Sequence, residues 1–68
     1  MNKNLGERLR FHRQRAKLSQ KEVAQQLYLE RQTVSSWECN RTRPDIDQLL
    51  KFCDIVGVEL YTLLGLHP

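Results

Sequence analysis

The chain has 68 residues, 40% of them hydrophobic and 28% charged, and a formal net charge of +3 at pH 7. This length suits the core of one small globular domain, so residues 1–68 are predicted to form a single domain. No apolar run approaches the ~18 residues of a membrane span, and no apolar segment follows the charged N-terminus as in a secretory signal, so we expect a cytoplasmic protein with no membrane partner.

Five helices and no strand are predicted, which gives an all-α fold. The first helix runs from about Leu5 to Arg15, and the spacing of Asn4 and Glu7 at its start is that of a capping box. Its inward face has the spacing of a helix and comprises Leu5, Leu9, His12 and Ala16. Because no Cys or His stands at ligand spacing nearby, we expect this histidine to be a packed or boundary residue rather than a metal ligand.

The second and third helices are joined by a very short connection. The second begins at Ser19, again with a glutamate three residues on, and ends near Leu27. The third spans residues 31–39 and has only two apolar anchors, Val34 and Trp37. About three residues separate the two helices, which is the arrangement of a helix-turn-helix.

The fourth and fifth helices follow Pro44. The fourth is expected to be capped by Asp45 and to end at Val56, before Gly57. Its inward stripe is predicted to comprise Ile46, Leu49, Leu50, Cys53 and Val56. A short fifth helix is predicted over residues 60–64.

The third helix places polar side chains opposite its two anchors. At 100° per residue, Gln32 and Ser36 fall almost directly opposite Val34 and Trp37. The residues flanking this polar strip are Arg31, Ser35 and Thr33. In the major groove of DNA, Gln can bond adenine, Arg can bond guanine and Thr can touch a thymine methyl. The strip therefore suits contacts with base edges, with a merely solvated helix face as the alternative.

Groups that suit phosphates border this strip in the sequence. Arg41 and Arg43 come directly after the third helix. Ser19 and Gln20 open the second helix, whose free N–H groups and positive dipole end form a natural phosphate site. Contacts of this kind would fix the register of the protein on a duplex and leave sequence preference to the third helix.

The distribution of charge is strongly asymmetric. The first 43 residues carry ten Lys and Arg against four Glu, a net charge of +6, whereas the last 25 carry one Lys against four acidic residues, a net charge of −3. This asymmetry favours a polyanion as the partner, although solvated helix faces can have the same pattern.

Residues that could carry metal, redox or catalytic chemistry are sparse. Cys53 falls in the apolar stripe of the fourth helix and is expected in the core, whereas Cys39 at a helix end leaves a redox role open. The two histidines, His12 and His67, lie far apart, and no nucleophile has an evident base beside it. We therefore expect no enzyme activity, no metal, no cofactor and no small-molecule ligand.

Taken together, these segments resemble the phage-repressor class of helix-turn-helix domains, the Xre/Cro-like family. The resemblance extends from Leu5 to Gly65 and is carried by "GERLR" at 6–10, "LSQKEVAQQL" at 18–27, "RQTVSSWE" at 31–38, "RTRPD" at 41–45 and "VGVELYTLLG" at 56–65. It implies a compact five-helix, lambda-repressor-like domain that binds operator DNA, usually as a dimer.

By position, the resemblance also implies a role for individual residues. The side chains that would face the groove are Arg31, Gln32, Thr33 and Ser36. Those that would contact the DNA backbone are Ser19, Gln20, Asn40, Arg41, Thr42 and Arg43. Arg13 and Glu38 match a structural ion pair that bridges the first helix to the end of the third.

Three positions depart from the family pattern. Tyr28 stands in the turn where the family usually has Gly, and it would be strained there if the position needs a positive φ. Glu30 replaces the usual Ser or Thr cap of the third helix, and Glu59 replaces a usual Ser before the fifth. Glutamate caps poorly, and at position 30 it would stand near phosphates, so it should weaken binding or discriminate among sequences.

The pattern predicts a sequence-specific transcriptional regulator, expected to be a repressor, that binds a palindromic operator as a dimer. Its half-sites are expected about 10–10.5 bp apart or a multiple of that distance. The dimer surface is expected in the apolar C-terminal segment, at Leu60, Tyr61, Leu64 and Leu66, although these side chains could instead close the core. The alternative is a protein-interaction adaptor or antitoxin-like partner with the same fold, which Tyr28 and Glu30 favour.

Overall fold

The computed structural model describes residues 4–66, which form five α-helices and, within that range, no strand. The helices are α1 (Leu5–Arg15), α2 (Gln20–Leu27), α3 (Arg31–Glu38), α4 (Ile46–Val56) and α5 (Leu60–Leu63). The predicted all-α class is therefore confirmed. His67 lies outside the described residues.

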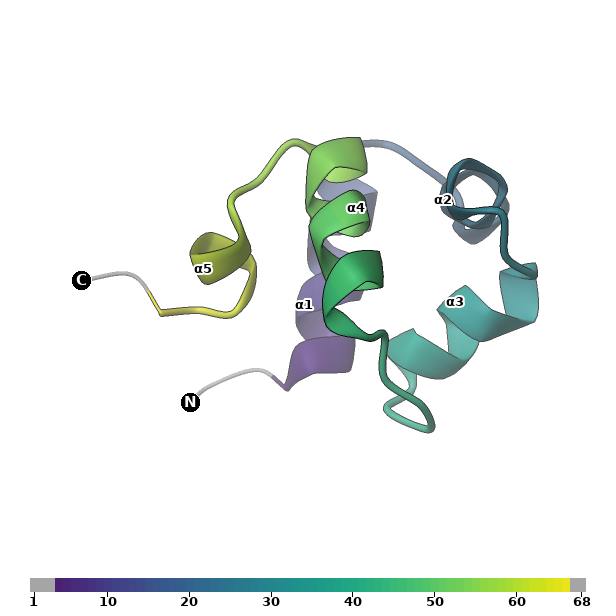
Figure 1. The fold of residues 1–68 in the computed structure, drawn as a ribbon, viewed down its shortest axis with the longest axis horizontal. Coiled ribbons are helices and arrows are strands. Elements are labelled where there is room, and N and C mark those ends of the chain that lie inside the picture. The colour runs from purple at the N-terminus through teal and green to yellow at the C-terminus, as the bar shows by residue number, and fades with distance from the viewer. Residues whose placement is uncertain (1–3, 67–68) are drawn as a thin grey trace.

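The five helices are arranged around a central pair. In Figure 1, α4 lies in front of α1 in the middle of the molecule, and these two helices pack on each other. The helix-turn-helix formed by α2 and α3 lies at one end of the longest axis, which is 34 Å long, and α5 lies at the other end. The central pair packs against α3 and α2 on one side and against α5 on the other.

The core draws side chains from all five helices. The largest fully buried side chains are those of Phe52, Leu9, Leu63, Val23 and Val34, and Trp37 is buried with them. Burying even one such side chain is worth roughly 1.5–3 kcal/mol, so this small cluster provides much of the driving force for folding.

The structure corrects the predicted inward stripe of α4. Ile46 and Leu50 are 58% and 47% exposed, whereas Phe52, which the prediction left out, is fully buried. Two stripes with helical spacing overlap on α4, and the helix is rotated so that Leu49, Phe52 and Cys53 face the core. The stripe that contains the aromatic ring removes the larger apolar area from water, which is the physical reason for this choice.

Local hydrogen bonds fix the starts of α2 and α4. The Ser19 hydroxyl accepts from the Glu22 amide at 3.0 Å, and the Glu22 carboxylate accepts from the Ser19 amide at 2.8 Å. Asp45 and Gln48 form the same reciprocal capping box at α4. At α1 only the Asn4 half of the predicted box is present. These caps set where each helix begins and so fix the lengths of the connections.

A buried ion pair joins α1 to the end of α3. Arg13 Nε lies 2.6 Å from Glu38 Oε2, and Arg13 NH2 donates to Glu38 Oε1 at 3.1 Å. The third guanidinium nitrogen, NH1, donates to the carbonyl of Leu18 at 2.8 Å. Both side chains of the pair are almost entirely buried. All three nitrogens of the guanidinium are bonded, so the orientation of Arg13 is fixed.

Gly6 provides a second point of close approach between α1 and α3. A Cβ atom at this position would lie 2.6 Å from the carbonyl oxygen of Glu38 and 2.7 Å from that of Trp37, so a larger residue does not fit. The Gly6 amide donates to Asn40 Oδ1 at 3.0 Å. Together with the ion pair, this contact holds the C-terminal end of α3 against α1.

His12 is half-buried and Cys53 is buried in the core, and both have a shifted pKa. Burial, followed by the charges of Arg15 and Arg8, lowers the pKa of His12 below its ordinary value of 6.5, which favours the neutral imidazole. Burial, followed by the charge of Asp54, raises the pKa of the Cys53 thiol, which makes Cys53 a poor nucleophile.

The turn between α2 and α3 contains a strained residue. Tyr28 has φ 58° and ψ 41°, the left-handed conformation that the sequence suggested, and its side chain is 95% exposed. The ring therefore gains little packing to offset the strain of a side chain in this region.

We expect Tyr28→Gly to raise the free energy of unfolding by about 1 kcal/mol, because glycine adopts positive φ without strain. Urea denaturation measures the change. Tyr28→Ala is the control, since it removes the exposed ring but keeps the Cβ atom, and it should stay within about 0.5 kcal/mol of the natural chain. An equal gain in both variants would contradict the strain explanation.

We expect Glu38→Gln to lower the free energy of unfolding by about 3 kcal/mol, because it leaves the buried guanidinium of Arg13 without a counter-charge. Glu59→Gln is the matched control, since Glu59 is exposed and makes no side-chain cap bond, and it should change stability by less than about 0.5 kcal/mol. The explanation fails if both variants unfold at the same urea concentration.

Candidate nucleic-acid interface

The outer face of α3 is open to solvent along its length. Val34 and Trp37 are buried on the inner side of the helix. On the outer side Arg31 and Gln32 are exposed, whereas Thr33 and Ser36 are half-buried. The structure thus keeps all four side chains predicted to face bases at the surface, and none of them is in the core.

Thr33 and Ser36 are half-buried because they line a shallow groove beside the helix. The groove has a volume of about 350 Å³ and is lined by Gln32, Thr33, Ser36, Trp37, Thr42, Arg43 and Gln48. It connects the outer face of α3 to the loop that follows the helix. Gln48 also belongs to the capping box of α4, and its place in this groove follows from the fold of the loop, which no local pattern indicates.

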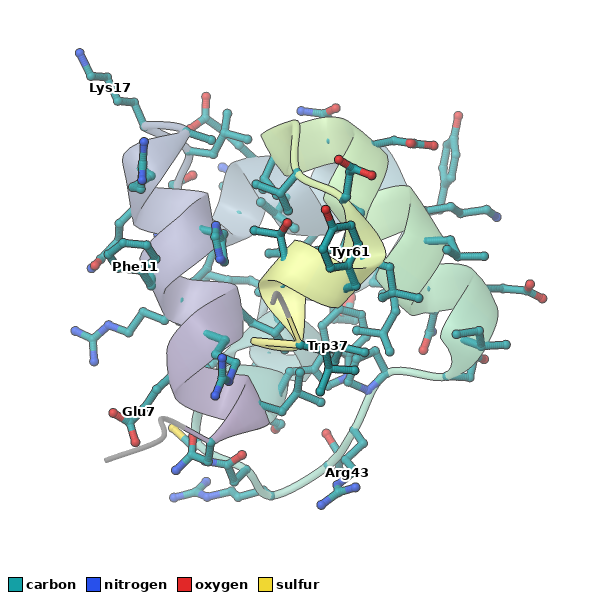
Figure 2. The ribbon with its side chains drawn as sticks, turned by 90° about the vertical axis from the view of Figure 1, so that its left-hand side faces the viewer. Glu7, Phe11, Lys17, Trp37, Arg43 and Tyr61 are labelled. Carbon is teal, nitrogen blue, oxygen red and sulfur yellow. The ribbon has the colours of Figure 1, made fainter. Side chains whose placement is uncertain are left out.

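The loop after α3 presents its cations to solvent. The Arg41 amide donates to the carbonyl of Ser36 at 2.9 Å, which folds the loop back against the helix. Arg41, Thr42 and Arg43 are exposed, and the next residue, Pro44, is buried and anchors the end of the loop. Figure 2 shows Arg43 at the lower edge of the molecule, away from Tyr61 on α5.

Asn40 begins this loop in the left-handed conformation, with φ 61°. It was predicted to contact phosphate, but its side-chain oxygen accepts the bond from the Gly6 amide. Only its side-chain NH2 group could therefore donate to a phosphate, and its first role in the free protein is to hold α1 against the end of α3.

The start of α2 is tied to both ends of α3 by side-chain hydrogen bonds. Gln20 Nε2 donates to Glu38 Oε1 at 3.0 Å, and Arg31 NH1 donates to Gln20 Oε1 at 3.1 Å. A continuous chain of bonds thus runs from Arg13 through Glu38 and Gln20 to Arg31. The sequence reasoning missed the bond between Gln20 and Arg31, because the two residues are eleven apart and meet only in the folded chain.

Two charges near this surface differ in their surroundings. Glu38 is neutralised by Arg13, so it contributes little negative potential outside. Glu30, at the N-cap of α3, is exposed and makes no side-chain cap bond. Arg31, Arg41 and Arg43 are exposed, so cations outnumber free carboxylates along this surface.

The residues predicted to form a dimer surface are divided between core and surface. Leu60 packs against the core, and Leu64 is half-buried. Tyr61 and Leu66 remain 46% and 69% exposed at the end of the molecule opposite α2 and α3. The sequence reasoning missed two further exposed apolar side chains, Ile46 and Leu50, which it had placed in the core.

Other kinds of site have no counterpart in the described part of the chain. Among residues 4–66 no group of three or more His, Cys, Asp and Glu is arranged to hold a metal ion. No helix in this range is long and apolar enough to cross a membrane. Cys39 is exposed at the end of α3.

Comparison with known proteins agrees with this geometry. A family model described as "Helix-turn-helix domain" matches residues 4–62. The chain is also 39% identical over 62 residues to the HTH-type transcriptional regulator ImmR of Bacillus subtilis (strain 168), a match that covers 91% of this chain and 49% of ImmR. The chain thus spans about half the length of the curated relative that it matches. The chain belongs to the helix-turn-helix domain family, which confirms the resemblance noted from its sequence.

Proposed function

We propose that this domain binds double-stranded DNA in a sequence-specific manner and regulates transcription, with α3 as the element that enters the major groove. The observation that carries the proposal is the exposed outer face of α3, bordered on one side by Arg41 and Arg43 and on the other by the start of α2. The major groove of DNA is wide enough for one α-helix, and this face belongs to the single helix α3.

The proposed contacts fall into two groups. Arg31, Gln32, Thr33 and Ser36 would bond base edges, since these side chains can donate hydrogen bonds to bases or touch a thymine methyl. Phosphates would be bound by Ser19, Gln20, Asn40, Arg41, Thr42 and Arg43. The second group lies on both sides of α3, so it would fix the position of the helix along the duplex.

The bond between Arg31 and Gln20 supports the proposed contact of Arg31 with a base. It holds the guanidinium next to the start of α2 before any DNA is present. A long side chain that is already ordered loses less conformational entropy on binding, so Arg31 would be ready for a guanine. The remaining guanidinium donors are available for its O6 and N7 atoms.

Regulation of transcription is inferred from the relative, which is named a transcriptional regulator. We infer repression, since a protein bound over a duplex blocks other proteins from it. One α3 helix covers only a few base pairs, so a dimer on a palindromic operator is needed for selectivity, with half-sites about 10–10.5 bp apart. The exposed Tyr61 and Leu66 at the α5 end support a dimer surface there.

We expect Arg43→Ala to weaken binding to all duplexes alike and to reduce the slope of log K against log salt by about 1, because one phosphate contact is lost.

Gln32→Ala should instead relax the preference at one base pair by about 1–3 kcal/mol. Fluorescence anisotropy on a duplex enriched from a random pool, at several salt concentrations, measures both effects.

The matched control is Lys51→Ala, which removes one exposed cation from α4, outside the proposed interface. It should leave the salt slope unchanged. If Arg43→Ala and Lys51→Ala behave alike, Arg43 contacts no phosphate. If the natural chain enriches no sequence and shows a flat, weak salt response, DNA binding is wrong and the adaptor function replaces it.

A further inference from the structure

Glu30 is an exposed carboxylate at the N-terminal end of α3. It occupies the N-cap position with φ −76° and ψ 146°, and its side chain makes no cap hydrogen bond. Ser19 and Asp45, at the same position of α2 and α4, both accept a bond from the helix that they cap. Within residues 4–66, Glu30 has no hydrogen bond or ion pair of its side chain with any other residue.

The neighbouring cation does not neutralise this carboxylate. Arg31 follows Glu30 directly, but its NH1 group donates to Gln20 Oε1. The only ion pair formed within residues 4–66 is that between Arg13 and Glu38. Both carboxylate oxygens of Glu30 are therefore free to accept hydrogen bonds from a ligand.

The placement of Glu30 brings it close to bases if α3 enters the groove as proposed. In helix-turn-helix proteins the N-terminal residues of the motif's second helix, which is α3 in this chain, contact base edges. A carboxylate accepts hydrogen bonds but cannot donate them. In the major groove guanine presents two acceptors and thymine one, whereas cytosine presents the N4 amino donor alone. Adenine offers a donor too, but beside the N7 acceptor, which repels a carboxylate.

We propose that Glu30 is a specificity-determining residue, which selects cytosine and rejects guanine and thymine at one base pair of each half-site. This inference rests on the proposed function. Phosphates offer no donor to Glu30 and repel its charge, so the carboxylate should also lower affinity for DNA of unrelated sequence. Selectivity at one base pair and weak non-specific binding would then have the same physical source.

The test selects duplexes from a random pool with three proteins of the same 68 residues: the natural chain, Glu30→Gln and Glu59→Gln. Glu30→Gln keeps the shape of the side chain and removes its charge. Glu59→Gln is the matched control, because Glu59 is also an exposed N-cap glutamate without a cap bond, but on α5. The natural chain and Glu59→Gln should enrich the same site, with cytosine at one position of each half-site.

Glu30→Gln should enrich the same site without the cytosine preference at that position. In a direct titration, replacing that C·G pair by T·A should weaken binding of the natural chain by about 5- to 150-fold and that of Glu30→Gln by less than about 3-fold. The thermal unfolding midpoints of the three proteins should agree, since neither glutamate makes a contact that folding depends on.

Two results would overturn the inference, and they are distinguishable. If Glu30→Gln retains the cytosine preference, because its affinity rises by the same factor for both duplexes or does not change for either, then Glu30 reads no base. If the natural chain itself enriches no sequence, the proposed function is wrong and the role of Glu30 is wrong with it.

Discussion

The buried ion pair between Arg13 and Glu38 is the interaction on which the placement of the other elements depends. It ties the last turn of α1 to the end of α3, and through Gln20 it also ties α2 to both. Removing either charge leaves the other buried and uncompensated, which is more costly than never having had the pair. A domain this small has few buried contacts, so the bonds of this one ion pair hold three helices together.

The ion pair also explains how a helix as short as α3 can expose a polar face and remain in place. α3 has only Val34 and Trp37 to anchor it by burial. Because the bonds from Glu38 and the close approach of Gly6 hold its end, the outer face does not need apolar residues for stability. Its polar side chains are thus free to be chosen for what they bind. Glu30, at the N-cap of α3, is likewise exposed and makes no side-chain cap bond.

The parts of the fold that depend on neighbours in sequence were predictable from it. The capping boxes at Ser19 and Asp45 follow from local rules. The left-handed conformation of Tyr28 was indicated by the family resemblance, because the family usually has Gly at this position. The rotation of α4 did not follow from such rules, since two overlapping stripes satisfy the same spacing and only packing of Phe52 chooses between them. The bond from Arg31 to Gln20 and the place of Gln48 in the groove depend on how separate helices meet, so no local pattern predicts them.

We propose that the chain of bonds from Arg13 to Gln20 holds the outer face of α3 in the position in which it binds DNA. An NMR titration of the backbone amides with an enriched duplex tests it most directly. The largest shift changes should fall on Ser19 and Gln20, on α3 and on residues 41–43, and the amides of the middle of α1 should change little. Large changes confined to the outer faces of α1 or α4, with α3 unaffected, would contradict it.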